Sequence, residues 1–141
     1  MKESWLVRLS VTKDQLNLIN MAMYEVLDRR MDLLGKVLEN PDIILSPDSL
    51  ATDINVASSV IHLIEQSTMV KSGKTNLKLT DDQLRLLRGA VYGLQSRRSE
   101  LLAKSAELYD FIGVPAFLVK DLECAKTIIK LLEKKVADWP F

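Results

Sequence analysis

Two spacings of hydrophobic residues alternate along the chain, one typical of strands and one typical of helices. In the stretch WLVRLSV (5–11) every second residue is apolar, with Leu9 and Val11 on the same side, which is the period of a β-strand. The stretch TNLKLT (75–80) shows the same alternation, with Leu77 and Leu79 on one side. We therefore predict two strands, each close to the start of one half of the chain.

Each predicted strand leads directly into a helix. Thr12 and Thr80 are residues that cap helix N-termini, and Gln15 and Gln83 stand three positions later, which is the spacing of a capping box. Beyond these caps, apolar residues recur at helical spacing. The resulting predicted helices span residues 13–39, 47–67, 81–110 and 115–136.

The second half of the chain repeats the first at an offset of 68 positions, without a gap. VTKDQLNLINMAMYEVLDRRMDLL (11–34) aligns with LTDDQLRLLRGAVYGLQSRRSELL (79–102), and the identities continue beyond the next loop. Two unrelated helices would not keep one offset through a loop. We interpret the chain as a single domain, 1–141, built from two repeats, 5–67 and 73–136, each consisting of a strand and two helices.

Pairing of the two repeats predicts the fold. One repeat alone would leave its strand unpaired and the apolar face of its helical hairpin uncovered. Two repeats can pair their strands and pack their hairpins together. We expect an α+β fold, mainly α: a four-helix bundle with pseudo-two-fold symmetry and a small two-stranded antiparallel ribbon.

An arginine pair recurs at the same place in each repeat. Arg30 continues the apolar series of its helix, so its side chain, and that of Arg98, should point partly inward. In a hairpin that turns near residue 43, position 30 lies opposite Asp53, and position 98 lies opposite Asp121. We predict structural ion pairs Arg30–Asp53 and Arg98–Asp121, which fix the register of each hairpin. Arg29 and Arg97 are the alternative partners of these aspartates. Binding of an anion or a partner by the arginines, and a break of the helix at this point, are the alternatives to structural ion pairs.

Composition narrows the classes of function. The 19 Lys and Arg residues balance 19 Asp and Glu residues, so zero net charge gives no general attraction to nucleic acid or to an anionic membrane. A local basic patch stays open. The lone cysteine, Cys124, fits a reducing, cytoplasmic location, and we expect neither a secretory leader nor a membrane-spanning segment.

No motif of the sequence indicates catalysis or metal binding. His62 is the only histidine and has no second ligand at metal-site spacing, and KSGKT (71–75) lacks the first glycine of a phosphate-binding loop. We therefore expect no metal, no cofactor and no enzymatic activity. The alternative is an enzyme whose active-site residues come together only in the folded chain.

These observations favour a non-enzymatic protein-interaction or regulatory accessory protein, of the kind found in phages and mobile elements. The sequence does not identify the protein partner, and a second copy of the chain, in a homo-oligomer, is one alternative. We expect no membrane partner. Trp139 and Phe141, in the final stretch DWPF, are candidate anchors for such a partner.

A second class of function follows from the order of the elements. The chain contains twice the order of one strand followed by two helices. This order resembles that of the ribbon-helix-helix DNA-binding regulators, and the stretches VRLSVTKDQL and SRRSELLAKSAEL are locally similar to that family. The first helix here is longer than in that family. The resemblance implies that the paired strands enter the major groove of DNA. The residues that would contact DNA are Arg8, Ser10, Lys74, Asn76 and Lys78.

Overall fold

The computed structural model of the chain describes residues 6–40, 42–44, 46–67, 73–108 and 116–137. The elements in these residues are β1 (Val7–Thr12), α1 (Lys13–Glu39), α2 (Pro47–Gln66), β2 (Lys74–Leu79), α3 (Asp81–Leu108) and α4 (Ala116–Ala137). The predicted mainly helical α+β class, with four helices and a two-stranded sheet, is confirmed. None of the described helices is long and apolar enough to cross a membrane.

The two strands pair in an antiparallel ribbon, as predicted. Leu9 stands opposite Leu77, and Val11 stands opposite Thr75. The inward residues of both strands are buried against the helices, with Leu9 and Leu79 fully covered. Because side chains alternate between the faces of a strand, this burial leaves the intervening residues on the solvent side.

Local hydrogen bonds start the helices where the sequence predicts. Thr12 Oγ1 accepts from the Gln15 amide at 3.2 Å, and Gln15 Oε1 accepts from the Thr12 amide at 2.9 Å. Thr80 and Gln83 form the same reciprocal pair, at 3.3 and 2.9 Å. The predicted capping boxes at the N-termini of α1 and α3 are therefore confirmed, and each satisfies two backbone donors that the helix itself cannot.

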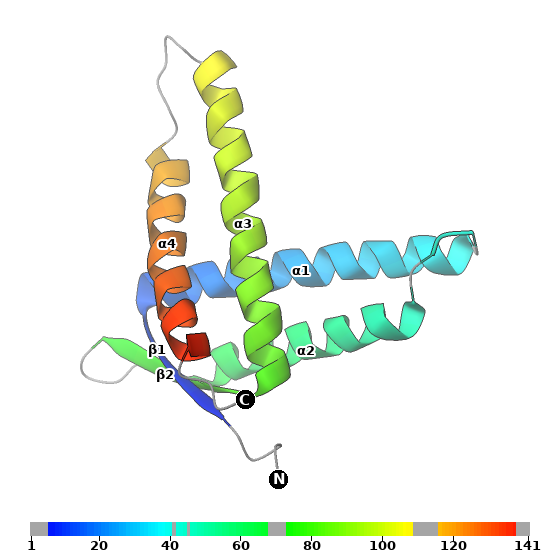
Figure 1. Cartoon of the computed structure of the whole chain (residues 1–141), viewed down its shortest axis with the longest axis horizontal. Coiled ribbons are helices and arrows are strands. Elements are labelled where there is room, and N and C mark those ends of the chain that lie inside the picture. Colours follow the sequence, from blue (N-terminus) through cyan, green and yellow to red (C-terminus); the bar gives the residue numbers. More distant parts are fainter. Residues whose placement is uncertain (1–5, 41, 45, 68–72, 109–115, 138–141) are drawn as a thin grey trace.

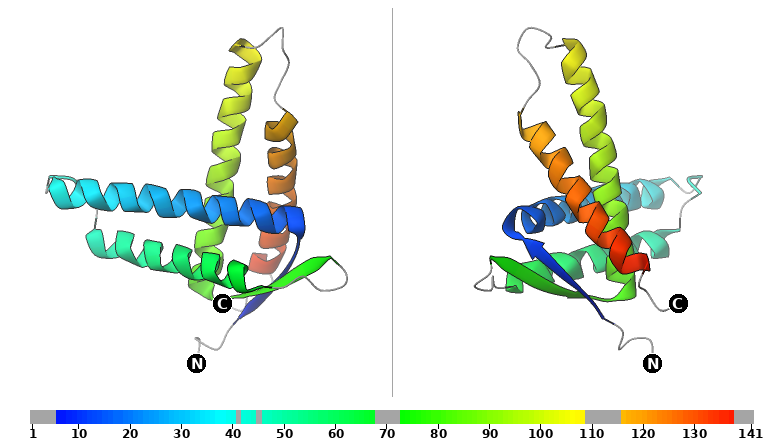
Figure 2. Two further views of the ribbon diagram at one scale, coloured as in Figure 1. Left: turned by 180° about the vertical axis from the view of Figure 1, so that it is seen from behind. Right: turned by 60° about the vertical axis from the view of Figure 1, so that its left-hand side comes forward.

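The helices form two hairpins, α1 with α2 and α3 with α4, which cross above the ribbon (Figure 1). The ribbon lies where the hairpins meet, away from the outer end of each hairpin, as both views in Figure 2 show. Burial in α1 ends at Val26 apart from Val37, and in α3, over residues 81–104 whose burial is described, the buried residues lie between Leu84 and Leu94. The common core therefore occupies the halves of α1 and α3 nearest the ribbon, where Ile19, Met23 and Leu87 pack.

Polar residues explain why the hairpins diverge beyond this core. Both long helices become charged at the arginine pairs, just after Val26 in α1 and Leu94 in α3. A charged helix face has no apolar surface to bury against the other hairpin. The expected four-helix packing is thus limited to one end of each hairpin.

Candidate nucleic-acid interface

The solvent side of the ribbon carries only polar residues. Arg8 stands opposite Lys78 at one end, and Ser10 stands opposite Asn76 at the centre. We call this surface the ribbon face. It consists of Arg8, Ser10, Thr12, Lys74, Asn76 and Lys78, of which Ser10 is half-buried and the others are exposed. All five residues that the family resemblance implies for DNA contact therefore lie together on one surface.

The ribbon face is basic although the whole chain is neutral. Arg8, Lys74 and Lys78 give it three cationic side chains, and none of its residues is acidic. Arg8 and Lys78 stand directly opposite each other, an arrangement that destabilises a strand pair through like-charge repulsion. An anionic ligand on this surface would relieve that repulsion.

The predicted arginine–aspartate contacts lie away from the strands, between the helices of each hairpin. Arg30 Nε lies 3.0 Å from Asp53 Oδ2, with each side chain about one-third exposed. Arg98 Nε lies 3.5 Å from Asp121 Oδ2, and Arg98 is only 17% exposed. The structure thus brings both predicted pairs of side chains together, the first more closely than the second.

Glu25 of α1 links the two hairpins, a contact that the sequence did not indicate. Its carboxylate accepts hydrogen bonds from Arg97 at 3.1 and 2.8 Å and from Arg98 at 3.2 Å. The position 68 residues after Glu25 is Gly93, which has no side chain to offer Arg29 in return. Comparison of the repeats therefore gave no signal for this contact.

A second unforeseen cluster joins α3 to α4. Glu133 Oε1 accepts from Tyr92 at 2.5 Å and from Arg88 Nη2 at 2.9 Å. The Tyr92 hydrogen bond, followed by those of Arg88, lowers the pKa of the Glu133 carboxyl below its ordinary value of 4.5. The same hydrogen bond, followed by desolvation, raises the pKa of Tyr92. These shifts describe an ion-pair cluster on the helix surface.

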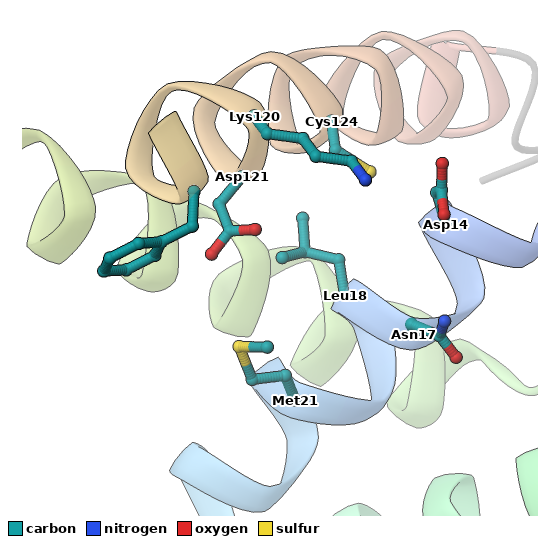
Figure 3. A pocket seen from close by; sticks show the side chains of 8 residues that line it. Asp14, Asn17, Leu18, Met21, Lys120, Asp121 and Cys124 are labelled. Atoms are coloured by element: carbon teal, nitrogen blue, oxygen red, sulfur yellow. The ribbon is translucent and has the colours of Figure 1, made fainter. Parts of the chain in front are cut away.

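A cavity of about 300 Å³ opens between the start of α1 and α4. Figure 3 shows Cys124 and Lys120 on one wall of it, with Asp14 on the other. Burial, together with the nearby Asp14 and Asp121, raises the pKa of the Cys124 thiol. Because the thiolate is the nucleophilic form, this environment makes Cys124 a poor nucleophile.

The described residues contain no group of three or more His, Cys, Asp or Glu side chains that could hold a metal ion. His62 is exposed on α2. Trp139 and Phe141, the predicted partner anchors, lie outside the described residues. Comparison with known proteins gives no match: no family model fits the chain, and neither a curated protein nor a solved structure is similar to it.

Proposed function

We propose that the protein is a non-enzymatic DNA-binding regulator that places the ribbon face in the major groove of duplex DNA. The observation that carries this proposal is the ribbon face itself, which holds three cations, an amide and two hydroxyls without a carboxylate. The major groove, about 12 Å wide, admits a two-stranded ribbon. The buried inner face holds the ribbon firmly on the helices, so that binding needs little ordering of the backbone.

The residue types of the ribbon face suit two different tasks. Asn76 and Ser10, at the centre, can pair with base edges, where an asparagine amide matches adenine. Lys74 and Lys78 can neutralise backbone phosphates, which position a protein without reading sequence. Arg8 can serve either task, because its guanidinium matches both guanine and phosphate.

We further propose that the chain arose by tandem duplication and has a pseudo-two-fold axis through the ribbon. Gln15 Nε2 donates to Thr127 Oγ1 at 3.0 Å, and Gln83 Nε2 donates to Ser59 Oγ at 3.0 Å. The offset of 68 relates Gln15 to Gln83 and Ser59 to Thr127, so the two contacts are equivalent. Each joins one repeat to the other, as the contacts of a dimer would. One chain would then supply both strands of the DNA-binding ribbon.

A salt-dependent mobility shift tests this proposal. The probe is a mixed-sequence duplex of about 20 base pairs, close to two turns of DNA. We expect the wild type to bind at low salt, and the double variant Arg8→Gln, Lys78→Gln to lose most of that binding. The control, Lys104→Gln with Lys120→Gln, removes the same charge from the outer half of the second hairpin and should bind as the wild type does. Equal weakening by both variants would contradict a role for the ribbon face.

A second proposed function is binding of another protein by the outer ends of the hairpins. Ile44 is 97% exposed and Leu38 70% at the end of the first hairpin, and Phe117 is 63% exposed at the end of the second. A contiguous patch of exposed apolar side chains is typical of an interaction site, and we propose that Leu38 and Ile44 contribute to one. The partner is unknown, and a second copy of the chain is among those this surface could take. We place both functions in the cytoplasm.

Affinity purification from the native host tests this second function. The double variant Leu38→Ser, Ile44→Ser should lose a protein that the wild type retains. A double variant of the ribbon face should retain it. Retention of the same proteins by all three forms would argue against a docking role for the outer ends.

A further inference from the structure

A groove beside the ribbon face is lined mainly by polar residues of the ribbon, α1 and α4. It has a volume of about 370 Å³ and lies between the ribbon, the start of α1 and the last turns of α4. We call it the lysine groove. Its lining consists of Ser10, Thr12, Gln15, Lys74, Thr127, Lys130, Leu131 and Lys134.

The lysine groove has three cations and no acidic residue in its lining. Lys74 comes from β2, and Lys130 and Lys134 lie one helical turn apart on α4. Like charges at this spacing destabilise a helix slightly. The neighbouring Glu133 does not offset them, because its carboxylate accepts hydrogen bonds from Arg88 and Tyr92 on α3. None of the three lysines has an ion-pair partner among the described residues.

The fold itself does not require these charges. At the positions 68 residues earlier, Lys130 and Lys134 are replaced by His62 and Gln66, both exposed. Those residues occupy the corresponding places on α2, and α2 packs in its hairpin without the two lysines. The cations are therefore a property of one side of the molecule and are not needed for the packing of the hairpin.

We propose that the lysine groove binds two neighbouring backbone phosphates, one at Lys130 and one at Lys134, of the same DNA whose bases meet the ribbon face. This inference rests on the proposed DNA-binding function. Ser10, Thr12 and Lys74 belong to both surfaces, so a duplex on the ribbon would bring its sugar–phosphate strand past the groove. Ammonium groups and hydroxyl donors are the groups that proteins use to bind phosphate oxygens. Thr12 offers such a hydroxyl, because its Oγ1 accepts from the Gln15 amide and keeps its own proton to donate. Because the other side has no such lysines, contacts with the duplex are asymmetric.

The salt dependence of DNA binding measures these contacts directly. Each neutralised phosphate contributes about 0.9 to the slope of log K against log salt concentration, so Lys130→Gln with Lys134→Gln should lower that slope by about two. Between about 50 and 200 mM salt, the wild type should then lose roughly tenfold more affinity than the double variant. The charge-matched control Lys104→Gln, Lys120→Gln should keep the wild-type slope. Circular dichroism melts of each protein verify that all are folded.

A gain-of-charge variant tests the asymmetry. His62→Lys with Gln66→Lys places two lysines at the corresponding positions of α2. We expect the slope of this variant to increase by about two, because a second strand of the duplex gains equivalent contacts. An unchanged slope would show that residues 62 and 66 do not face a phosphate strand, which would contradict a duplex placed symmetrically across the ribbon.

The outcomes separate the inference from the function on which it rests. Absence of DNA binding by the wild type overturns both. A different outcome overturns the inference alone. In that case the Arg8 and Lys78 variant loses DNA binding, but the Lys130→Gln, Lys134→Gln variant keeps the wild-type salt slope. Calorimetry with inorganic pyrophosphate distinguishes a small-anion site: pyrophosphate binding that needs Lys130 and Lys134, with an unchanged slope for DNA, would assign the groove to a small anion instead.

Discussion

Leu9 of β1 stands directly opposite Leu77 of β2, and both side chains are buried, at 0% and 1% exposure. Leu77 is also the residue 68 positions after Leu9, so the ribbon pairs these equivalent residues with each other. Pairs on either side follow in order: Val7 with Leu79, and Val11 with Thr75. An axis of pseudo-symmetry through the ribbon would give this register.

The Leu9–Leu77 pair provides a test of the symmetric interpretation. Leu9→Ala and Leu77→Ala should each lower the free energy of unfolding by about 2–5 kcal/mol, because each deletes a fully buried leucine side chain. The two losses should be similar if the surroundings are equivalent. Urea denaturation measures them. Losses that differ by several kcal/mol would argue against equivalent environments.

The two kinds of arginine contact should differ in their effect on stability. Glu25→Gln removes the charge that Arg97 and Arg98 share, and Glu25 is about one-quarter exposed. We expect a loss of about 1–3 kcal/mol, because two partly buried guanidinium groups lose a charged acceptor.

Asp53→Ala supplies the comparison, since the pair it forms with Arg30 is more exposed. We expect a lower melting temperature but a smaller loss, up to about 1 kcal/mol. Thermal and urea unfolding of both variants test the order. An unchanged melt for Asp53→Ala combined with loss of ligand binding would overturn the structural role of Arg30 and Asp53.

Glycines within the long helices offer a way to raise stability. An added Cβ meets nothing within 4 Å at Gly35 or Gly89, so alanine there should stabilise the protein by about 0.5–1 kcal/mol through its higher helix propensity. At Gly93 the Cβ would lie 3.0 Å from Arg97 Nη1, so Gly93→Ala should gain less and should disturb the Arg97–Glu25 contact. Denaturant midpoints of the three variants test this order. A larger gain at Gly93 than at Gly89 would contradict it.

The hydrogen bonds of Glu133 with Arg88 and Tyr92 predict that the free energy of unfolding falls at acidic pH. The pKa of Glu133 is lowered in the folded protein, so its stabilising contribution is present above 4.5, the ordinary value, and is lost as pH falls through the folded value. Glu133→Gln should therefore flatten part of the fall in stability below about pH 5. Urea denaturation at several acidic pH values measures the effect.

Glu65 supplies the matched control for this experiment, because it is the residue 68 positions before Glu133. Its contact with Tyr24 is long, at 3.4 Å, and the position equivalent to Arg88 is Asn20. Glu65→Gln should leave the acid profile close to that of the wild type. Equal flattening by both variants would show that the Arg88–Tyr92 cluster is not the cause.

The sequence predicted the features that depend on local spacing. Strand alternation placed Leu9 and Leu77 inward, and the capping boxes at Thr12 and Thr80 fixed where α1 and α3 begin. These features need only a few neighbouring residues. The approach of Arg30 to Asp53 also followed, because a hairpin sets which positions face each other.

Contacts between the hairpins could not be predicted in the same way. The crossing of the hairpins depends on how whole helix surfaces pack, and Glu25 meets Arg97 only because of that crossing. Alignment of the chain with itself at an offset of 68 gave no signal for two contacts, since Glu25 and Arg88 align with Gly93 and Asn20. For the ribbon face, the residues were predicted from a family resemblance, whereas the adjoining lysine groove was not foreseen.

An NMR titration locates the DNA-binding surface on the fold. ¹⁵N-labelled protein is titrated with a mixed-sequence duplex of about 20 base pairs, and amide shifts are mapped onto the fold. We predict that the shifts concentrate in β1 and β2, with a second group around Lys130 and Lys134 on α4. Shifts centred on the outer ends of the hairpins, near Ile44 and Phe117, or no shifts at low salt, would contradict DNA binding by the ribbon face.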